Sequence, residues 1–161
     1  MSGVLNFGAP MSIGSILYAI DFKCSNEGLL RGIIIYGAIP RENVKLGWQR
    51  KYIYSGEFVS DIEVQLSDYS NRMIASMKRQ INVTEEELLE LLFDEPVVLK
   101  KTWYTITLEM SGPGMIRSGI NGENVVSLGD GQSIEFRNSS LSSDTSVLNG
   151  QIPGLLLCRR R

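Results

Sequence analysis

The sequence predicts an all-β fold, an antiparallel β-sandwich of the jelly-roll type with about nine or ten strands. Three observations favour this fold class. Apolar and polar residues alternate with a period of two in several segments. Turn-forming Gly, Ser, Asn and Pro residues recur at short intervals between these segments. A helical pattern is limited to one short segment, residues 84–93.

The first strands are predicted near the start of the chain. Residues 16–22 alternate, with Ile16, Tyr18, Ile20 and Phe22 on one face. A polar turn follows, and residues 29–36 are then apolar at nearly every position, which is typical of a strand buried on both faces. Gly32 lies within this run and Gly37 directly follows it, and we expect them to mark a bend or a close approach of two backbones.

Further strands are predicted over residues 52–66, 73–83, 97–110, 134–137 and 150–158, with a turn at 67–71. The strand at 97–110 has the clearest alternation, and Trp103 is out of phase with its apolar face, so Trp103 either covers the core or is exposed for recognition. Gly150 begins the last strand, and Pro153 within it indicates a bulge or an edge position. The glycine-rich stretch between residues 111 and 131 is predicted to form loops and tight turns.

Residues 84–93 are predicted to form one short helix. Thr84 and Glu87 fit a capping box, and Leu88, Leu91 and Leu92 form an apolar stripe. Pro96 prevents the helix from continuing. We expect this helix to lie across one end of the sheets, with a leucine stripe for a partner as the alternative.

Composition limits the function classes. The 161 residues, 43% of them hydrophobic, fit one domain over residues 1–161, and 16 basic against 18 acidic residues give no overall field that would attract nucleic acid. There is no histidine, which excludes Ser-His-Asp and Cys-His catalysis and histidine-ligated zinc. Carboxylates or lysines could still carry proton chemistry.

The chain has two cysteines, Cys24 and Cys158, too few for a four-ligand zinc site. Residues 1–10 lack the features of a signal peptide, so we expect reduced thiols in a cytoplasmic protein, with a disulfide in a secreted chain as the alternative. No apolar run reaches the roughly 18 residues of a membrane span. We expect neither a cofactor nor a metal.

Two patterns could carry chemistry, and both have a simpler explanation. The glycines at 112, 114, 119 and 122 lack the Gly-Lys-Ser/Thr element of a phosphate-binding loop. Asp61 and Glu63 share one strand face, as a glycosidase carboxylate pair could, but solvation of a surface explains such a pair more often.

Several segments resemble the PHR domain, named for the Pam and Highwire family of very large RING-type ubiquitin ligases. They occur in the family's order at residues 16–22, 32–37, 96–99, 103–106, 119–122 and 150–153. The long connection over residues 41–49 and the acidic helix predicted over residues 84–93 make the chain more similar to the PHR domains of the large neuronal ligases than to those of the BTB adaptors.

The resemblance implies a β-sandwich, cut from a much larger protein, that acts as a non-catalytic protein-interaction module in the cytoplasm of neurons. It would recruit substrates or regulators to a ligase that acts in axon and synapse development. A protein partner or ubiquitination substrate is then expected, without nucleic-acid binding or membrane insertion, and the isolated domain is expected to be monomeric. The alternatives are an architectural domain that orients its neighbours and a carboxylate-based enzyme on a jelly roll.

The resemblance gives no site on its own, and we predict the partner-binding site at the glycine-rich loops, because their backbone can approach a partner closely. Arg117, Asn121 and Asn124 would supply hydrogen bonds there. Gly32, Gly37, Gly150 and Pro153 are predicted to be structural. The alternative is that the loops are plain connecting turns.

Overall fold

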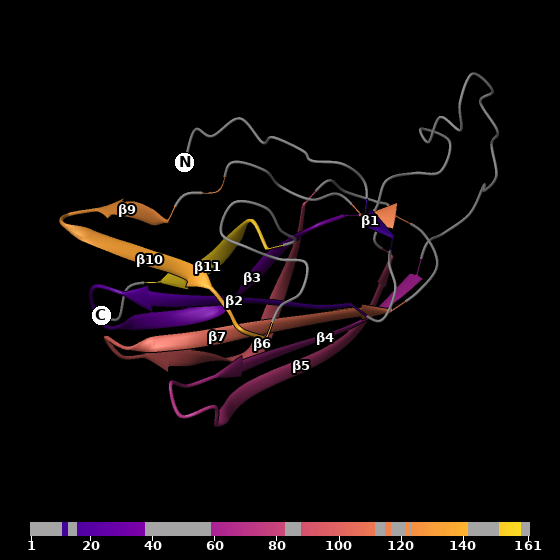
Figure 1. Ribbon diagram of the computed structural model, residues 1–161, viewed down its shortest axis with the longest axis horizontal. Coiled ribbons are helices and arrows are strands. Elements are labelled where there is room, and N and C mark those ends of the chain that lie inside the picture. Colours follow the sequence, from indigo (N-terminus) through magenta and orange to yellow (C-terminus); the bar gives the residue numbers. More distant parts are fainter. Residues whose placement is uncertain are drawn as a thin grey trace, which may run out of the picture.

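A computed structural model of the protein describes residues 11–12, 16–37, 59–82, 88–111, 115–116, 122, 124–141 and 152–158. All regular secondary structure in these residues is β-strand (Figure 1). The described strands are β1 (Met11–Ser12), β2 (Ile16–Cys24), β3 (Gly28–Tyr36), β4 (Val59–Ser67), β5 (Met73–Asn82), β6 (Leu88–Leu99), β7 (Trp103–Ser111), β8 (Met115–Ile116), β9 (Val125–Gly129), β10 (Gln132–Asn138) and β11 (Gly154–Cys158). The predicted all-β antiparallel sandwich is confirmed.

Two sheets form the sandwich. The larger has six strands in the order β5-β4-β7-β2-β10-β9, and the smaller has three in the order β11-β3-β6. A separate short pairing joins β1 to β8, and every described pairing is antiparallel. Figure 1 shows the β9–β10 hairpin, in orange, extending at one side of the molecule, with β4 and β5 at the opposite side of the same sheet. No helix in the described residues has the length and apolarity needed to cross a membrane.

The core lies between the two sheets and follows the period-two pattern of the sequence. In β7, Tyr104, Ile106, Leu108 and Met110 are buried, while the residues between them are half-buried or exposed. The other large, fully buried side chains come from both sheets and include Tyr18, Phe22, Leu30, Ile33, Ile35, Leu66 and Leu99. Phe22 of β2 stacks on Tyr104 of β7, with ring centroids 5.6 Å apart.

Two tight connections join neighbouring strands of the larger sheet. Between β4 and β5, one carboxylate oxygen of Asp68 accepts hydrogen bonds from the N–H groups of Ser70 and Arg72 at 2.8 and 3.1 Å, and Asn71 takes φ 60°. Between β9 and β10, Asp130 and Gly131 both have positive φ, at 52° and 73°, as a two-residue hairpin turn requires.

The predicted helix at residues 84–93 is wrong over its described part. Residues 88–93 belong to β6, which pairs with β3 through contacts such as Leu91 opposite Ile33 and Leu89 opposite Ile35. Leu91 and Phe93 are buried, whereas Leu92 is exposed, so the burial follows a strand's period. A helix this short is stable only when tertiary packing supports it. Pairing with the apolar strand β3 instead gives this segment backbone hydrogen bonds and buries Leu91 and Phe93. Residues 83–87, with the capping box, lie outside the described residues.

The structure also corrects two predicted strands and adds one that was not predicted. The predicted strand at 97–110 is two strands in different sheets, separated at residues 100–102. The last strand begins at Gly154, so Pro153 precedes it rather than lying within it. β9 lies within the stretch predicted to be loops and turns, where the Asp130-Gly131 pair is a hairpin signal that sequence reasoning missed.

Candidate functional site

The two lateral sides of the sandwich differ. On one side, β5 of the larger sheet lies next to β6 of the smaller sheet, and Arg79 joins them. Its guanidinium donates to the backbone carbonyl of Leu92 at 3.2 Å and to the carboxylate of Asp94 at 3.0 Å. This side is therefore bridged by side-chain contacts.

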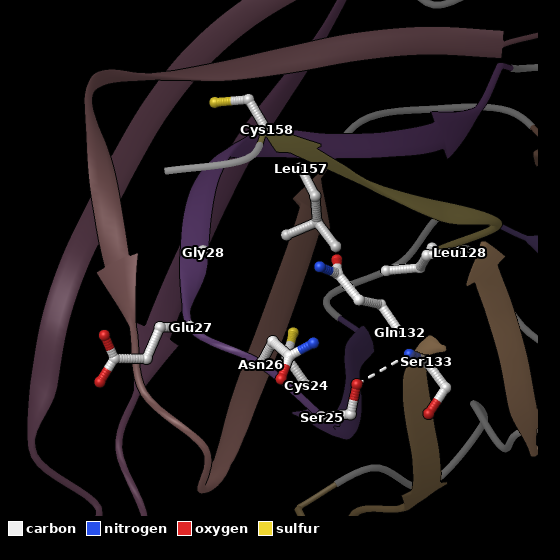
Figure 2. Close-up of a pocket in the computed structure, with 10 residues that line it drawn as sticks. All are labelled: Cys24, Ser25, Asn26, Glu27, Gly28, Leu128, Gln132, Ser133, Leu157 and Cys158. Atoms are coloured by element: carbon white, nitrogen blue, oxygen red, sulfur yellow. Dashed lines mark hydrogen bonds between the residues drawn. The ribbon is translucent and has the colours of Figure 1, made fainter. Parts of the chain in front are cut away.

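The other side holds a cavity of about 320 Å³ between the β9–β10 end of the larger sheet and β11 of the smaller sheet (Figure 2). The turn between β2 and β3 closes it from a third direction. Its lining residues are Cys24, Ser25, Asn26, Glu27, Gly28, Leu128, Gln132, Ser133, Leu157 and Cys158. A volume of this size is within the range of cavities that hold a small ligand or a few side chains of a partner.

Two hydrogen bonds between Ser25 and Ser133 hold the rim of this cavity. The N–H of Ser25 donates to the carbonyl of Ser133 at 2.9 Å, and the N–H of Ser133 donates to the hydroxyl of Ser25 at 2.8 Å, the bond that Figure 2 draws as a dashed line. These two bonds fix the β2–β3 turn against the start of β10. The cavity wall is therefore held in place by the fold on this side.

The lining combines apolar and neutral polar groups. Leu128, which is 43% exposed, and Leu157 supply apolar surface, and the Gln132 carboxamide extends toward Leu157 in Figure 2. The carboxylate of Glu27 points away from these two side chains in the same view. A carboxamide carries both a donor and an acceptor, so Gln132 matches a neutral polar group better than an ion.

Both cysteines line this cavity, and both are free thiols in the structure. Cys24 is buried at the end of β2, and burial raises the pKa of its thiol because the thiolate would lose hydration. Cys158 is half-buried at the end of β11. In the described residues, no group of three or more His, Cys, Asp or Glu side chains is placed to hold a metal ion.

A polar network covers part of the outer face of the larger sheet. Asp21 on β2 is 9% exposed, and its carboxylate accepts from the Thr105 hydroxyl at 2.6 Å and from Arg137 Nε at 2.9 Å. The Arg137 guanidinium also lies over the Trp103 ring, 3.9 Å from its centroid. Trp103 is therefore half-buried on the outer face, beneath Arg137, and it is not a core residue. Because its members satisfy one another, the network stabilises the sheet and offers few free groups to a ligand.

The carboxylate pair of β4 lies in a second, shallower hollow. Asp61 accepts from the Gln80 carboxamide at 3.2 Å, and Glu63 accepts from the Gln65 carboxamide at 2.9 Å. Glu63 also lies opposite Glu109 of β7 in the strand register. Each carboxylate thus already has an amide partner on the surface of the sheet.

The predicted site residues are placed only in part. Asn124 is exposed directly before β9, and its carbonyl accepts from the N–H of Phe136 at 2.7 Å. Arg117 and Asn121 lie outside the described residues. Asn124 belongs to the same end of the larger sheet as the cavity, but it does not line the cavity.

Among the predicted structural residues, Gly32 has the clearest role. A Cβ built on Gly32 would come within 2.9 Å of the Leu91 carbonyl carbon and the Leu92 Cα, and closer still to the Leu91 oxygen. Gly37 is buried directly after β3, Pro153 is half-buried before β11, and Gly150 lies outside the described residues. The predicted close backbone approach is therefore present at Gly32.

Sequence reasoning missed the cavity because its wall comes from four separate parts of the chain, at residues 24–28, 128, 132–133 and 157–158. Their approach depends on which sheet each strand joins and on the order of strands within that sheet. No local pattern carries this information. The one usable signal was Asp130-Gly131, which would have placed Leu128 and Gln132 on the two arms of one hairpin.

Comparison with protein families identifies a match that covers most of the chain. The family model of the PHR domain matches residues 13–158 of this chain. No curated protein shows a significant match to the sequence.

Proposed function

Because the chain belongs to the PHR domain family, we propose that it acts as a non-catalytic protein-interaction module and that a partner binds at the cavity beside Leu128 and Leu157. The cavity carries this proposal. Its lining joins apolar side chains to carboxamides, and a protein segment offers apolar side chains and peptide groups that complement both.

At a finer level, we propose that the module belongs to a large ubiquitin ligase of the Pam/Highwire type in the cytoplasm of neurons. There it would recruit substrates or regulators in axon and synapse development. The order of the family-like segments and the long connection over residues 41–49 support this assignment. The segment 84–93 supports it less than the sequence suggested, because its described part is a strand.

The test compares two leucines that are equally exposed. Leu128 lines the cavity and Leu92 lies on β6, and each is 43% exposed. Leu128→Asp places a charge at the cavity, whereas Leu92→Asp makes the same change elsewhere on the surface. The wild type and both variants would be used for affinity capture from neuronal lysate, with quantitative mass spectrometry.

We expect at least one captured protein to be lost with Leu128→Asp and retained with Leu92→Asp, because only the first change disturbs the cavity. Each variant's thermal midpoint would first be compared with that of the wild type. Captured proteins that respond equally to both variants would contradict a partner site at the cavity.

A further inference from the structure

Among the strands that the structure describes, four lie at the edges of the two sheets, and two of these edges are protected. β6 carries Asp94, Glu95 and Pro96, and its pairing with β3 is interrupted there. β5 carries Lys78 and Arg79, and Arg79 bridges to β6. Charged side chains, proline and interrupted pairing are the usual means by which proteins prevent a free edge from pairing with another chain.

β9 has neither of the side-chain protections, although its pairing with β10 shifts register between Gln132 and Ser133. Its sequence, Val-Val-Ser-Leu-Gly, contains neither a charged residue nor a proline, and every residue except Val126 is exposed. Val125 is 57% exposed. β11 also lacks charge, but it is half-buried along its whole length. Among the strands that the structure describes, β9 pairs only with β10.

The direction of the β9 backbone groups follows from the hydrogen bonds of its neighbour. The Phe136 N–H donates to the Asn124 carbonyl, so Asn124 and Phe136 are a hydrogen-bonded pair. In an antiparallel ladder such pairs alternate with pairs that are not hydrogen-bonded, so Val126 bonds to β10 whereas Val125 and Ser127 turn their N–H and C=O groups to the free edge.

The bonds of Ser133 agree with this alternation. Ser133 lies opposite Ser127 in the register, yet its N–H and C=O are both bonded to Ser25 on the other side. The backbone groups of Ser127 therefore do not pair with Ser133, which leaves them directed away from β10.

We propose that the free edge of β9 receives an extended segment of a partner protein, which adds a seventh strand to the larger sheet. This inference rests on the proposed function, since it assigns the binding mode of a partner at this end of the domain. The N–H and C=O groups that β9 directs outward can form hydrogen bonds with the backbone of an added strand. The exposed side chains of Val125 and Leu128 favour β-branched or other apolar residues in that added strand.

The charge around β9 indicates the partner's composition. Asp130 and Glu135 flank the strand, and the guanidinium of Arg137, the hairpin's basic residue, is held by Asp21. Lys23, opposite Glu135, offsets part of this charge. The chemistry therefore favours an extended segment that carries lysine or arginine beside its apolar residues, and it disfavours a second copy of this acidic hairpin.

Val125→Pro tests the proposal with little disturbance of the hairpin. Proline removes the one N–H that Val125 directs to the free edge, and proline is tolerated at edge positions of this kind. Val125→Thr is the matched control, because threonine keeps both the N–H and the β-branched shape. The probe is a phage-displayed library of random peptides of about twelve residues, long enough to cover a strand of ordinary length.

We expect the peptides selected on the wild-type domain to alternate β-branched with basic residues and to lack central proline. Their affinity should fall about fivefold to tenfold with Val125→Pro, as expected for a lost hydrogen bond and local displacement. It should fall clearly less with Val125→Thr, which keeps the N–H and loses only one methyl group of apolar contact. Bound peptide should also slow amide exchange of Val125 and Ser127 in the wild type, a result that does not depend on the variant folding.

Three outcomes would overturn strand addition: no peptide selected, equal affinity for the Val125→Pro and Val125→Thr forms, or unchanged exchange at Val125 and Ser127. A peptide lost only with Leu128→Asp would overturn strand addition while leaving the interaction module in place. The two proposals therefore fail on different results.

Discussion

Gly32 shows how one residue can set the distance between two strands. It lies opposite Leu92 in the β3–β6 pairing, where the register shifts, and its missing side chain lets the Leu91 carbonyl come close. A backbone carbonyl held in a ladder cannot turn aside as the end of a flexible side chain could. Glycine is therefore required at position 32, because any Cβ there would collide with the backbone of Leu91 and Leu92.

We expect Gly32→Ala to reduce the free energy of unfolding by at least about 2 kcal/mol, in the range of substitutions that displace packed backbone. Gly28→Ala is the control, since a Cβ there would lie 3.6 Å from the Cys158 carbonyl oxygen, an ordinary contact. Its effect should stay within about 1 kcal/mol in either direction. Urea unfolding of both variants makes the comparison, and equal effects would refute the steric account.

The two thiols of the cavity should differ in reactivity. Burial raises the Cys24 pKa above its ordinary value of 9.0, so little thiolate forms at pH 8, and the buried sulfur is also hard to reach. We expect iodoacetamide to label the half-buried Cys158 first. Peptide mass spectrometry over time would measure both rates, and labelling of Cys24 as fast as Cys158 would count against the buried thiol.

The same raised pKa sets the sign of a pH effect. The folded protein holds the Cys24 proton more tightly than the unfolded chain does, so this contribution to stability is complete below about pH 9 and is lost as pH rises through the folded pKa. Burial raises the Tyr36 pKa too, which adds a loss of the same sign at higher pH. Urea unfolding at alkaline pH would measure the decline.

At the scale of elements, Arg79 stabilises the contact between β5 and β6 in two ways, through an ion pair and through a bond to the backbone. In the ion pair, the Arg79 side chain is 37% exposed and the Asp94 side chain is 89% exposed. Solvent strongly screens the attraction between charges that are this exposed. Its bond to the Leu92 carbonyl and the packing of its aliphatic stem are lost only when Arg79 itself is changed.

We therefore expect Asp94→Ala to leave the urea midpoint close to that of the wild type, while Arg79→Ala lowers it clearly. Adding salt should change the difference little, because the backbone bond and the stem dominate. A loss as large for Asp94→Ala as for Arg79→Ala would show instead that the ion pair holds the two edges together.

The elements differed in how well the sequence predicted them. β7 was readable because each buried residue, from Tyr104 to Met110, alternates with a half-buried or exposed one. β6 was misread because three leucines at residues 88, 91 and 92 also fit a helix, and only pairing with β3 decides between the two. β9 was missed because four of its five residues are exposed, so burial left almost no pattern in it.

At the scale of the whole molecule, the all-β class was predictable and the sheet order was not. Period-two alternation identifies a strand and its buried face, but it does not indicate which sheet the strand belongs to. It could not show that β3 and β11 pair in the smaller sheet, or that β2 lies between β7 and β10 in the larger one. The cavity could not be predicted for the same reason, because Leu128 and Leu157, which line it, belong to different sheets. Local chemistry predicted the turn at Asp68, whereas long-range pairing decided the site.

The strand order also sets a sequence of events during synthesis. The outer pairs of the larger sheet, β4–β5 and β9–β10, are local hairpins that can close in microseconds. β2 is made early, yet both its partners, β7 and β10, lie far downstream. At roughly 5–20 residues per second, a nascent β2 waits for several seconds before β7 is made. During that time its apolar face has no sheet to join, so the ribosome-bound domain should depend on chaperones until the partners of β2 have been made.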